Sequence, residues 1–187
     1  GVKKLLKFAP AGAMTLLHDR MDISTVPEND CHGAVTQLMV RYLTGQVGAY
    51  LEFYEFFTDG ALMGVPDYVP AEIVEGRITV MPNAFGSFGE GLLNVSKLKT
   101  GPVTVVRLGG DYSLHVATGV AETPPAWEEA GWTPPAPQLP SLKITFDGDT
   151  DEFLANVMGQ HYIICYGDYS RELSDLADIL GIPLILN

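Results

Sequence analysis

Two glutamates in the first third of the chain, Glu28 and Glu52, have the type and spacing that shared carboxylate chemistry needs. Two carboxylates brought together can hold a divalent cation or act as an acid–base pair. Glu52 interrupts an apolar run between Leu51 and Phe53, where an unpaired carboxylate is costly to bury. The alternative is that Glu28 only caps a helix and Glu52 faces water from a half-exposed strand. A third group beside the pair would decide between these interpretations.

The segment after Glu28 has the pattern of a helix from Asn29 to Leu43, preceded by Pro27 and ended by Gly45. Apolar residues recur there at three- and four-residue steps along one face, as in an amphipathic helix. The residues of this face are Cys31, Val35, Leu38 and Tyr42, with Ala34 and Met39 beside them.

The nearly continuous apolar run from Val47 to Phe57 predicts a buried strand. A helix of about fifteen residues advances roughly 22 Å, and a strand from Val47 to Glu52 returns about 17 Å. Glu52 is therefore expected near the level of Glu28. At a helix entrance, backbone N–H groups favour an anionic side chain such as Glu28.

Composition limits the classes of function. The chain has 187 residues, 47% of them hydrophobic and 18% charged, which indicates a globular protein with an ample core. Its formal net charge of −12 argues against a nucleic-acid or anionic-membrane partner. No apolar run approaches the roughly 18 residues of a membrane-spanning helix, and no secretory signal pattern opens the chain. Cys31 and Cys165 lack metal or redox spacing and favour a reduced, cytoplasmic protein.

The rest of the chain alternates short segments of β character with turn signals, which predicts an antiparallel barrel or sandwich. We expect strands at Ala61–Val65, Ala71–Val74, Arg77–Met81, Gly91–Lys97, Val103–Leu108, Ser113–Val120, Ser141–Phe146 and Tyr162–Tyr166. A short helix is expected at Phe153–Met158, and a final one from Asp168 or Ser170 to Gly181.

Two stretches between these segments are predicted to be loops. The proline-rich stretch from Ala121 to Pro140 is expected to be a long loop that acts as a lid or contact surface. Its Trp127 and Trp132 could stack on a sugar ring, although pinning the loop is the commoner role. The glycines of Gly86–Gly91 are in the wrong order for a dinucleotide loop and predict turns.

The residues alone do not decide which side chain is the third group of the site. His161 directly precedes the apolar strand from Tyr162, where a lone histidine is more often structural. His18, His32 and His115 are equally available as ligands. No Walker motif, nucleophile elbow, paired Cys-x-x-Cys or HExxH sequence occurs.

The run PENDCHGAVTQLMVRYLTG resembles a segment of the L-fucose isomerase and L-arabinose isomerase family. In that segment an active-site glutamate, followed two positions on by an aspartate, opens a helix rich in Gly-Ala-Leu-Thr, and Glu28 and Asp30 match these positions. The family's next active-site carboxylate lies on the following strand, where Glu52 stands. The runs GALMG to AEIVEGRITVMP, GSFGEGLLNVSKLKTGPVTVVRL and HYIICYGDYSRELSDLADILGI are also similar to its carboxy-terminal region. In the last of these, the histidine before the strand is the metal ligand and corresponds to His161.

The resemblance implies that Glu28, Glu52 and His161 hold Mn²⁺, with Mg²⁺ as the alternative, since oxygen and imidazole donors suit these ions. It implies an aldose–ketose isomerase that works through a cis-enediol. Both glutamates would double as catalytic acid–base groups in an order that the sequence does not decide. Arabinose-type relatives place a further histidine just after the glycine that corresponds to Gly64, where this chain has Val65. A three-ligand site of the fucose type is therefore expected.

The implied architecture is α+β. We expect residues 1–60 to be the C-terminal part of an α/β domain that carries the two glutamates, and residues 61–187 to be an antiparallel β-barrel with a C-terminal helix. The chain opens abruptly, so we expect a fragment whose other partners are a sugar substrate, missing N-terminal domains and further copies in a trimer or hexamer. The alternative function is a non-catalytic sugar-binding or assembly domain derived from the same fold. A weaker one is an unrelated β-barrel hydrolase that uses the carboxylate pair.

Overall fold

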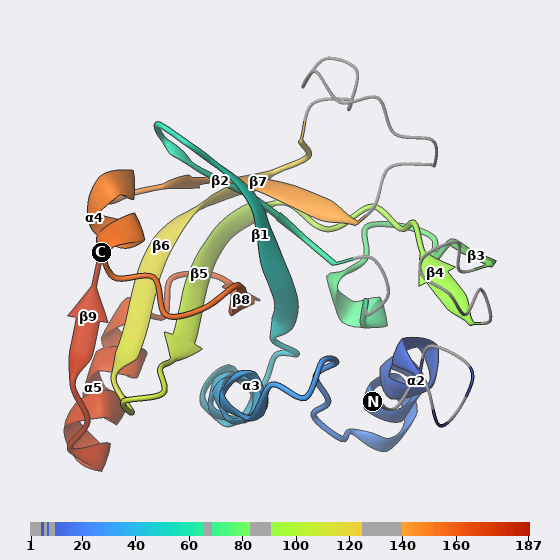
Figure 1. Ribbon diagram of the computed structural model, residues 1–187, viewed down its shortest axis with the longest axis horizontal. Coiled ribbons are helices and arrows are strands. Elements are labelled where there is room, and N and C mark those ends of the chain that lie inside the picture. The colour runs from blue at the N-terminus through green and yellow to red at the C-terminus, as the bar shows by residue number, and fades with distance from the viewer. Residues whose placement is uncertain (1–4, 6, 8–9, 66–68, 83–90, 125–139) are drawn as a thin grey trace.

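Six antiparallel strands close into a barrel in the computed structural model of the chain (Figure 1). The structure describes residues 5, 7, 10–65, 69–82, 91–124 and 140–187. Around the barrel the strands follow the order β5-β8-β1-β2-β7-β6, and pairing of β5 with β6 closes it. They are β1 (Ala49–Phe57), β2 (Gly60–Gly64), β5 (Gly101–Leu108), β6 (Leu114–Glu122), β7 (Ser141–Phe146) and β8 (His161–Tyr166). The predicted α+β class with an antiparallel barrel is confirmed.

The remaining elements surround this barrel (Figure 1). Strand β9 (Leu184–Leu186) adds to the barrel in parallel with β6, and β3 (Val80–Pro82) pairs with β4 (Leu92–Asn94) in a separate ribbon. The helices are α2 (Ala11–Met21), α3 (Cys31–Thr44), the 3-10 turn η1 (Ala71–Ile73), α4 (Thr150–Ala155) and α5 (Ser170–Leu180). Helix α3 packs against β5 and β8, and α5 packs against β6. Among the described residues, none of the helices has the length and apolar character needed to cross a membrane.

Strand β1 is hydrogen-bonded on both edges within the barrel, to β2 on one side and to β8 on the other. The predicted division at residue 60 therefore runs between two paired strands, because Phe57 lies opposite Gly60 across the hairpin. The strand that carries Glu52 is a barrel strand.

The prediction of a strand at Ala71–Val74 is wrong. Pro70, with a φ of −57°, leads into a 3-10 turn in which the Ile73 amide donates to the Pro70 carbonyl at 3.2 Å. Other predicted elements are present with shifted ends. Helix α4 begins at Thr150, because the Asp149 side chain accepts a hydrogen bond from the Glu152 amide. Strand β9 was not predicted. Most of Gly86–Gly91 and of the loop with Trp127 and Trp132 lies outside the described residues.

The predicted helix is present as α3, but its apolar face is the exposed one. Val35, Leu38 and Tyr42 are 45%, 39% and 82% exposed. The face against the barrel is instead formed by Gly33, Thr36, Gln37 and Val40.

Close packing and hydrogen bonds explain which face of α3 is buried. The Thr36 hydroxyl accepts a hydrogen bond from the Leu108 amide at 2.9 Å. The Gln37 amide donates to the Gly48 carbonyl at 2.8 Å. A Cβ at Gly33 would stand 2.8 Å from the Tyr50 ring. Small and hydrogen-bonding side chains therefore let this helix approach the strands closely.

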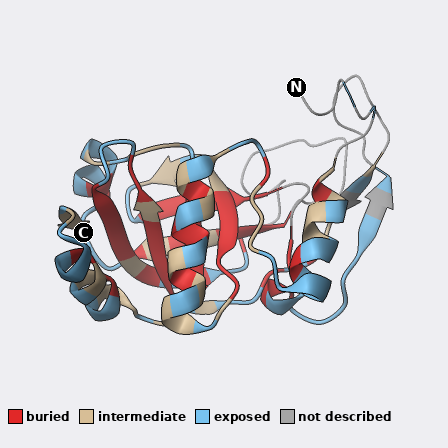
Figure 2. Cartoon of the chain, turned by 90° about the horizontal axis from the view of Figure 1, so that it is seen from below, coloured by how far each residue is buried: buried red, intermediate tan, exposed pale blue. Residues whose placement is uncertain are grey.

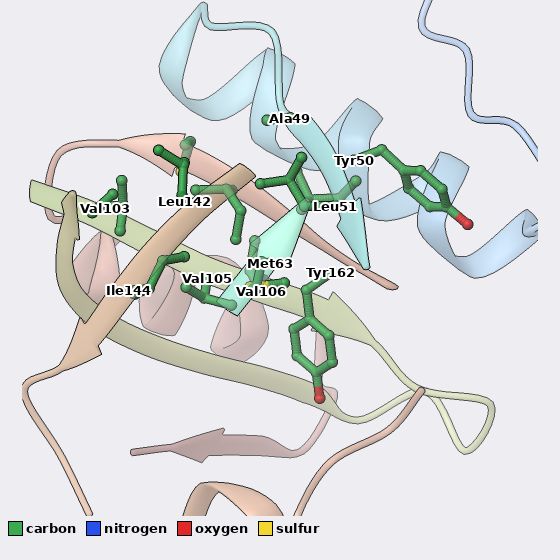
Figure 3. Close-up of a cluster of buried hydrophobic side chains, with 14 of the residues drawn as sticks. Ala49, Tyr50, Leu51, Met63, Val103, Val105, Val106, Leu142, Ile144 and Tyr162 are labelled. Atoms are coloured by element: carbon green, nitrogen blue, oxygen red, sulfur yellow. The ribbon is translucent and has the colours of Figure 1, made fainter. Parts of the chain in front are cut away.

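The hydrophobic core fills the barrel and extends under the helices (Figure 2). Leu51, Met63, Val105 and Ile144 are fully buried among side chains from neighbouring strands (Figure 3). Tyr50 points away from this cluster, toward the helix (Figure 3). The face of β1 that carries Tyr50 and Glu52 is thus available for a site outside the barrel, since alternate residues of a strand point to opposite faces.

Candidate metal centre

The structure brings Glu28, Glu52 and His161 together. His161 Nε2 lies 3.7 Å from Glu28 Oε2 and 3.7 Å from Glu52 Oε2. Three side chains from separate parts of the chain thus converge: a loop before α3, the middle of β1 and the first residue of β8.

Strand pairing positions two of the three. Glu52 of β1 and His161 of β8 are directly opposed in antiparallel register. Opposed residues place their Cβ atoms about 4.5–5.5 Å apart on the same face of a sheet. The side-chain Nε2 of Gln160 donates to Glu52 Oε2 at 2.6 Å, which orients the carboxylate. The side chain of Glu52 is 19% exposed, so it lies at the edge of solvent.

The third side chain is placed by an unusual backbone. Glu28 and Asn29 have φ values of 67° and 60°, in the left-handed region that non-glycine residues rarely adopt. This conformation costs most non-glycine residues roughly 1–2 kcal/mol and asparagine less, and strain of this kind is concentrated at functional sites. The turn directs the chain into α3 and leaves the Glu28 side chain 63% exposed beside the imidazole.

Asp30 links this turn to the barrel. It is the N-cap of α3 and accepts a hydrogen bond from the Gly33 amide at 2.8 Å. Its carboxylate also accepts two bonds from Arg107, at 2.8 and 3.1 Å, and one from the Tyr50 hydroxyl at 3.1 Å. Burial alone would raise the pKa of Asp30, but these hydrogen bonds and the Arg107 charge hold it below its usual value. Asp30 is therefore a carboxylate at neutral pH.

His161 is held from two sides. The Tyr50 ring stacks on the imidazole with centroids 4.5 Å apart and an 8° angle between planes. The Arg107 guanidinium donates to the His161 carbonyl at 2.6 Å. Burial lowers the pKa of His161 against the opposing charges of Glu28 and Asp30. The imidazole is thus neutral at neutral pH, the form that binds metal ions.

The donor set fits a divalent cation chemically. Two carboxylates and one neutral imidazole suit Mn²⁺. With metal–donor distances of roughly 2.0–2.2 Å, one ion can contact atoms up to about 4 Å apart. Among the described residues, no three His, Cys, Asp or Glu side chains already stand in an arrangement that could hold a metal ion. Binding an ion would therefore require a side chain of the three to move, and that of Glu28 is the most exposed of them, at 63%.

The other predicted candidates lie elsewhere. His115 is buried and contacts the Tyr162 hydroxyl at 2.8 Å. His18 is buried on α2, and His32 lies at the start of α3. Among the described residues, His161 is the histidine within 4 Å of both glutamates. Val65, at the position of the arabinose-type histidine, is a buried core residue.

Sequence reasoning missed Tyr50, Arg107 and Gln160. Arg107 left a signal, because it is a charged residue in an otherwise apolar strand segment. Tyr50 stands two residues before Glu52, so the two share one face of the strand. Gln160 left none, since its bond to Glu52 depends on strand register. No family model matches the chain, and no curated protein matches it.

Proposed function

We propose that this chain carries the metal site of an aldose–ketose isomerase of the L-fucose isomerase type. The observation that supports it is the position of His161 Nε2, 3.7 Å from a carboxylate oxygen of Glu28 and 3.7 Å from one of Glu52. The order of motifs along the chain supports the same function. On this proposal the partners are a sugar, the N-terminal domains of a longer protein and further copies in a trimer or hexamer.

Glu28, Glu52 and His161 would hold Mn²⁺ or Mg²⁺. The bound ion would supply Lewis-acid polarisation of the sugar carbonyl, which acidifies the neighbouring C–H. His161 would contribute its neutral Nε2, because burial lowers the pKa of this imidazole. Tyr50, stacked on the ring, would exclude water from one face of it.

The two carboxylates would move the protons. Conversion of an aldose to a ketose takes a proton from C2, gives a cis-enediol and returns a proton to C1, while a second proton passes from the C2 hydroxyl to the C1 oxygen. One carboxylate of the Glu28 and Glu52 pair would act at carbon as general base and then acid. The other would serve the oxygens. No net oxidation occurs, so no redox cofactor is required.

Solvent exchange tests this proposal. The full chain is incubated with Mn²⁺ and L-fucose or another aldose in D₂O. The amount of ketose, the deuterium at its C1 and the deuterium at C2 of the recovered aldose are measured. We expect Mn²⁺-dependent exchange that Glu28→Gln and Glu52→Gln each reduce at least 100-fold, since general acid–base catalysis contributes about 10²–10⁴-fold. Glu55→Gln is the matched control, because Glu55 is an exposed glutamate of the same strand.

Other outcomes would contradict the proposal. Equal exchange rates in Glu28→Gln, Glu52→Gln and the parent would show that neither carboxylate acts as an acid–base group. Sugar binding that is indifferent to metal, without exchange at C2, would instead support a non-catalytic sugar-binding domain.

A further inference from the structure

We infer that Asp30, Arg107 and Tyr50 are positioning residues that hold His161 and the Glu28 turn in one fixed arrangement. This inference rests on the proposed function, because it assigns these residues a task in metal binding. They would not contact the metal ion; they would act through the residues that do.

Arg107 connects β5 to the site at two points. Its guanidinium donates to the carbonyl of His161 at 2.6 Å and pairs with both oxygens of Asp30. The planar guanidinium offers several donors in a fixed fork, which a lysine ammonium cannot reproduce. One side chain therefore fixes the distance between the strand that carries His161 and the cap of α3.

Asp30, Arg107 and Tyr50 form a hydrogen-bonded network, and Asp30 connects it to Glu28. Its carboxylate accepts four hydrogen bonds, from Gly33, Tyr50 and twice from Arg107. Only Asn29 separates it from Glu28, and both residues of that turn are left-handed. A carboxylate with all its bonds made can hold an unfavourable turn that local propensity would not maintain.

Tyr50 joins the two ends of the network. Its ring stacks on His161 while its hydroxyl donates to Asp30. The imidazole is thus fixed in its plane by the ring, and the ring is fixed by the carboxylate. Residues that orient metal ligands in this way tune affinity without touching the ion.

The network is shielded from water. The side chains of Arg107 and Asp30 are only 11% and 14% exposed. Removing one partner of a pair at this depth destabilises the protein, because the charge of the other partner stays buried and uncompensated. An exposed pair serves for comparison: Arg41 of α3 forms an ion pair with Asp22, the C-cap of α2, whose side chain is 77% exposed.

The test separates positioning from simple stabilisation. Arg107→Lys keeps the charge but loses the fork, and Tyr50→Phe keeps the stacked ring but loses one hydrogen bond. Arg41→Lys is the control. For each folded variant, Mn²⁺ affinity is measured by calorimetry, unfolding by urea titration, and the nuclear Overhauser effect between the Tyr50 and His161 rings by NMR in metal-free protein.

We expect Arg107→Lys to weaken Mn²⁺ binding roughly 10- to 100-fold, the range typical of residues behind metal ligands. The ring–ring effect should weaken with it, and Arg41→Lys should match the parent in both. Tyr50→Phe should weaken Mn²⁺ binding less than Arg107→Lys does. It replaces Arg107→Lys as the test if that variant does not fold.

Parent-like Mn²⁺ affinity in folded Arg107→Lys, or in Tyr50→Phe if Arg107→Lys does not fold, would overturn the inference and leave the proposed function standing. A parent that binds no Mn²⁺ would contradict the proposed function. In that case the ring–ring effect still decides whether Arg107 positions His161, because it requires no metal.

Discussion

Glu52 and His161 face each other across strands β1 and β8, and Nε2 of Gln160, the residue before His161, donates to the Glu52 carboxylate at 2.6 Å. The pairing register of two barrel strands thus creates a carboxylate–imidazole pair and the group that orients it. A shift of one residue in this register would send the side chains to opposite faces.

Gln160→Ala tests whether that orientation matters. We expect Mn²⁺ affinity to fall several-fold to roughly 10-fold, because Glu52 loses the donor that fixes its oxygen. The free energy of unfolding should change by no more than about 1 kcal/mol, the usual net value of one hydrogen bond. Calorimetric titration beside urea unfolding measures both. An unchanged Mn²⁺ affinity would show that Glu52 is positioned by the strand alone.

The strained turn predicts a conflict between stability and function. Glu28→Gly should raise the free energy of unfolding by roughly 0.5–1 kcal/mol, since glycine accepts a left-handed φ without strain. The same change should abolish Mn²⁺ binding with the loss of the carboxylate.

Asn29→Gly is the control for the Glu28→Gly change. It keeps Glu28 and should gain less stability, because asparagine tolerates the left-handed region better than glutamate does. Urea titration of the three proteins compares them. A destabilised Glu28→Gly protein would mean that side-chain contacts of Glu28, rather than the network around Asp30, maintain the turn.

The fold class followed from the sequence because short β segments with turns between them leave few alternatives. Two failures have physical causes. Ala71–Val74 has β-like residues, but Pro70 sets a turn that outweighs their propensity. In α3 the apolar periodicity gave the correct helix and the wrong buried face, because Thr36 and Gln37 make specific bonds to the barrel.

For the candidate site, periodicity and lengths alone placed Glu28 near Glu52, and resemblance was needed to choose His161 among four histidines. The residues that position these side chains could not be predicted from periodicity or from the resemblance. The pairing of Arg107 with Asp30 joins parts of the chain far apart in sequence. Only the closed barrel brings β5 and β8 beside the start of α3.

The inverted helix face makes a direct prediction about stability. Val40→Ala should cost roughly 1–3 kcal/mol, because Val40 is 1% exposed and its truncation leaves a cavity against the barrel. Leu38→Ala removes a larger side chain that is 39% exposed and should cost about 0.5 kcal/mol or less. Urea unfolding of both variants measures the difference. The reverse order would place the Leu38 face, rather than the Val40 face, in the packed interface.

Acid should destabilise the fold through its buried histidines. His115 is fully buried, with Tyr162 and Asn187 hydrogen-bonded to its two ring nitrogens. In the neutral ring, Nε2–H can donate to the Asn187 side-chain oxygen while Nδ1 accepts from the Tyr162 hydroxyl, which itself accepts from the Met158 amide. Both nitrogens are then satisfied, and a second ring proton would break the hydrogen bond that the Tyr162 hydroxyl donates to Nδ1. Burial accordingly lowers the pKa of His115 below 6.5.

Because the pKa of His115 is lower in the folded than in the unfolded chain, its contribution to stability is complete above pH 6.5. As the pH falls below this value, the unfolded chain binds a proton that the folded chain refuses. The free energy of unfolding should then decrease by up to about 1.4 kcal/mol per pH unit from this residue. Burial likewise lowers the pKa of His18 and of His161. These two histidines therefore also contribute to the fall in the parent's free energy of unfolding at acid pH.

His115→Gln isolates the contribution of His115 to the pH dependence of stability, since glutamine keeps hydrogen-bonding capacity without a titrating ring. Urea unfolding at pH 7.5, 6.5, 5.5 and 5.0 should give a shallower slope for this variant than for the parent, with the two curves converging on acidification. Parallel slopes for His115→Gln and the parent would mean that the folded barrel accepts the proton at His115.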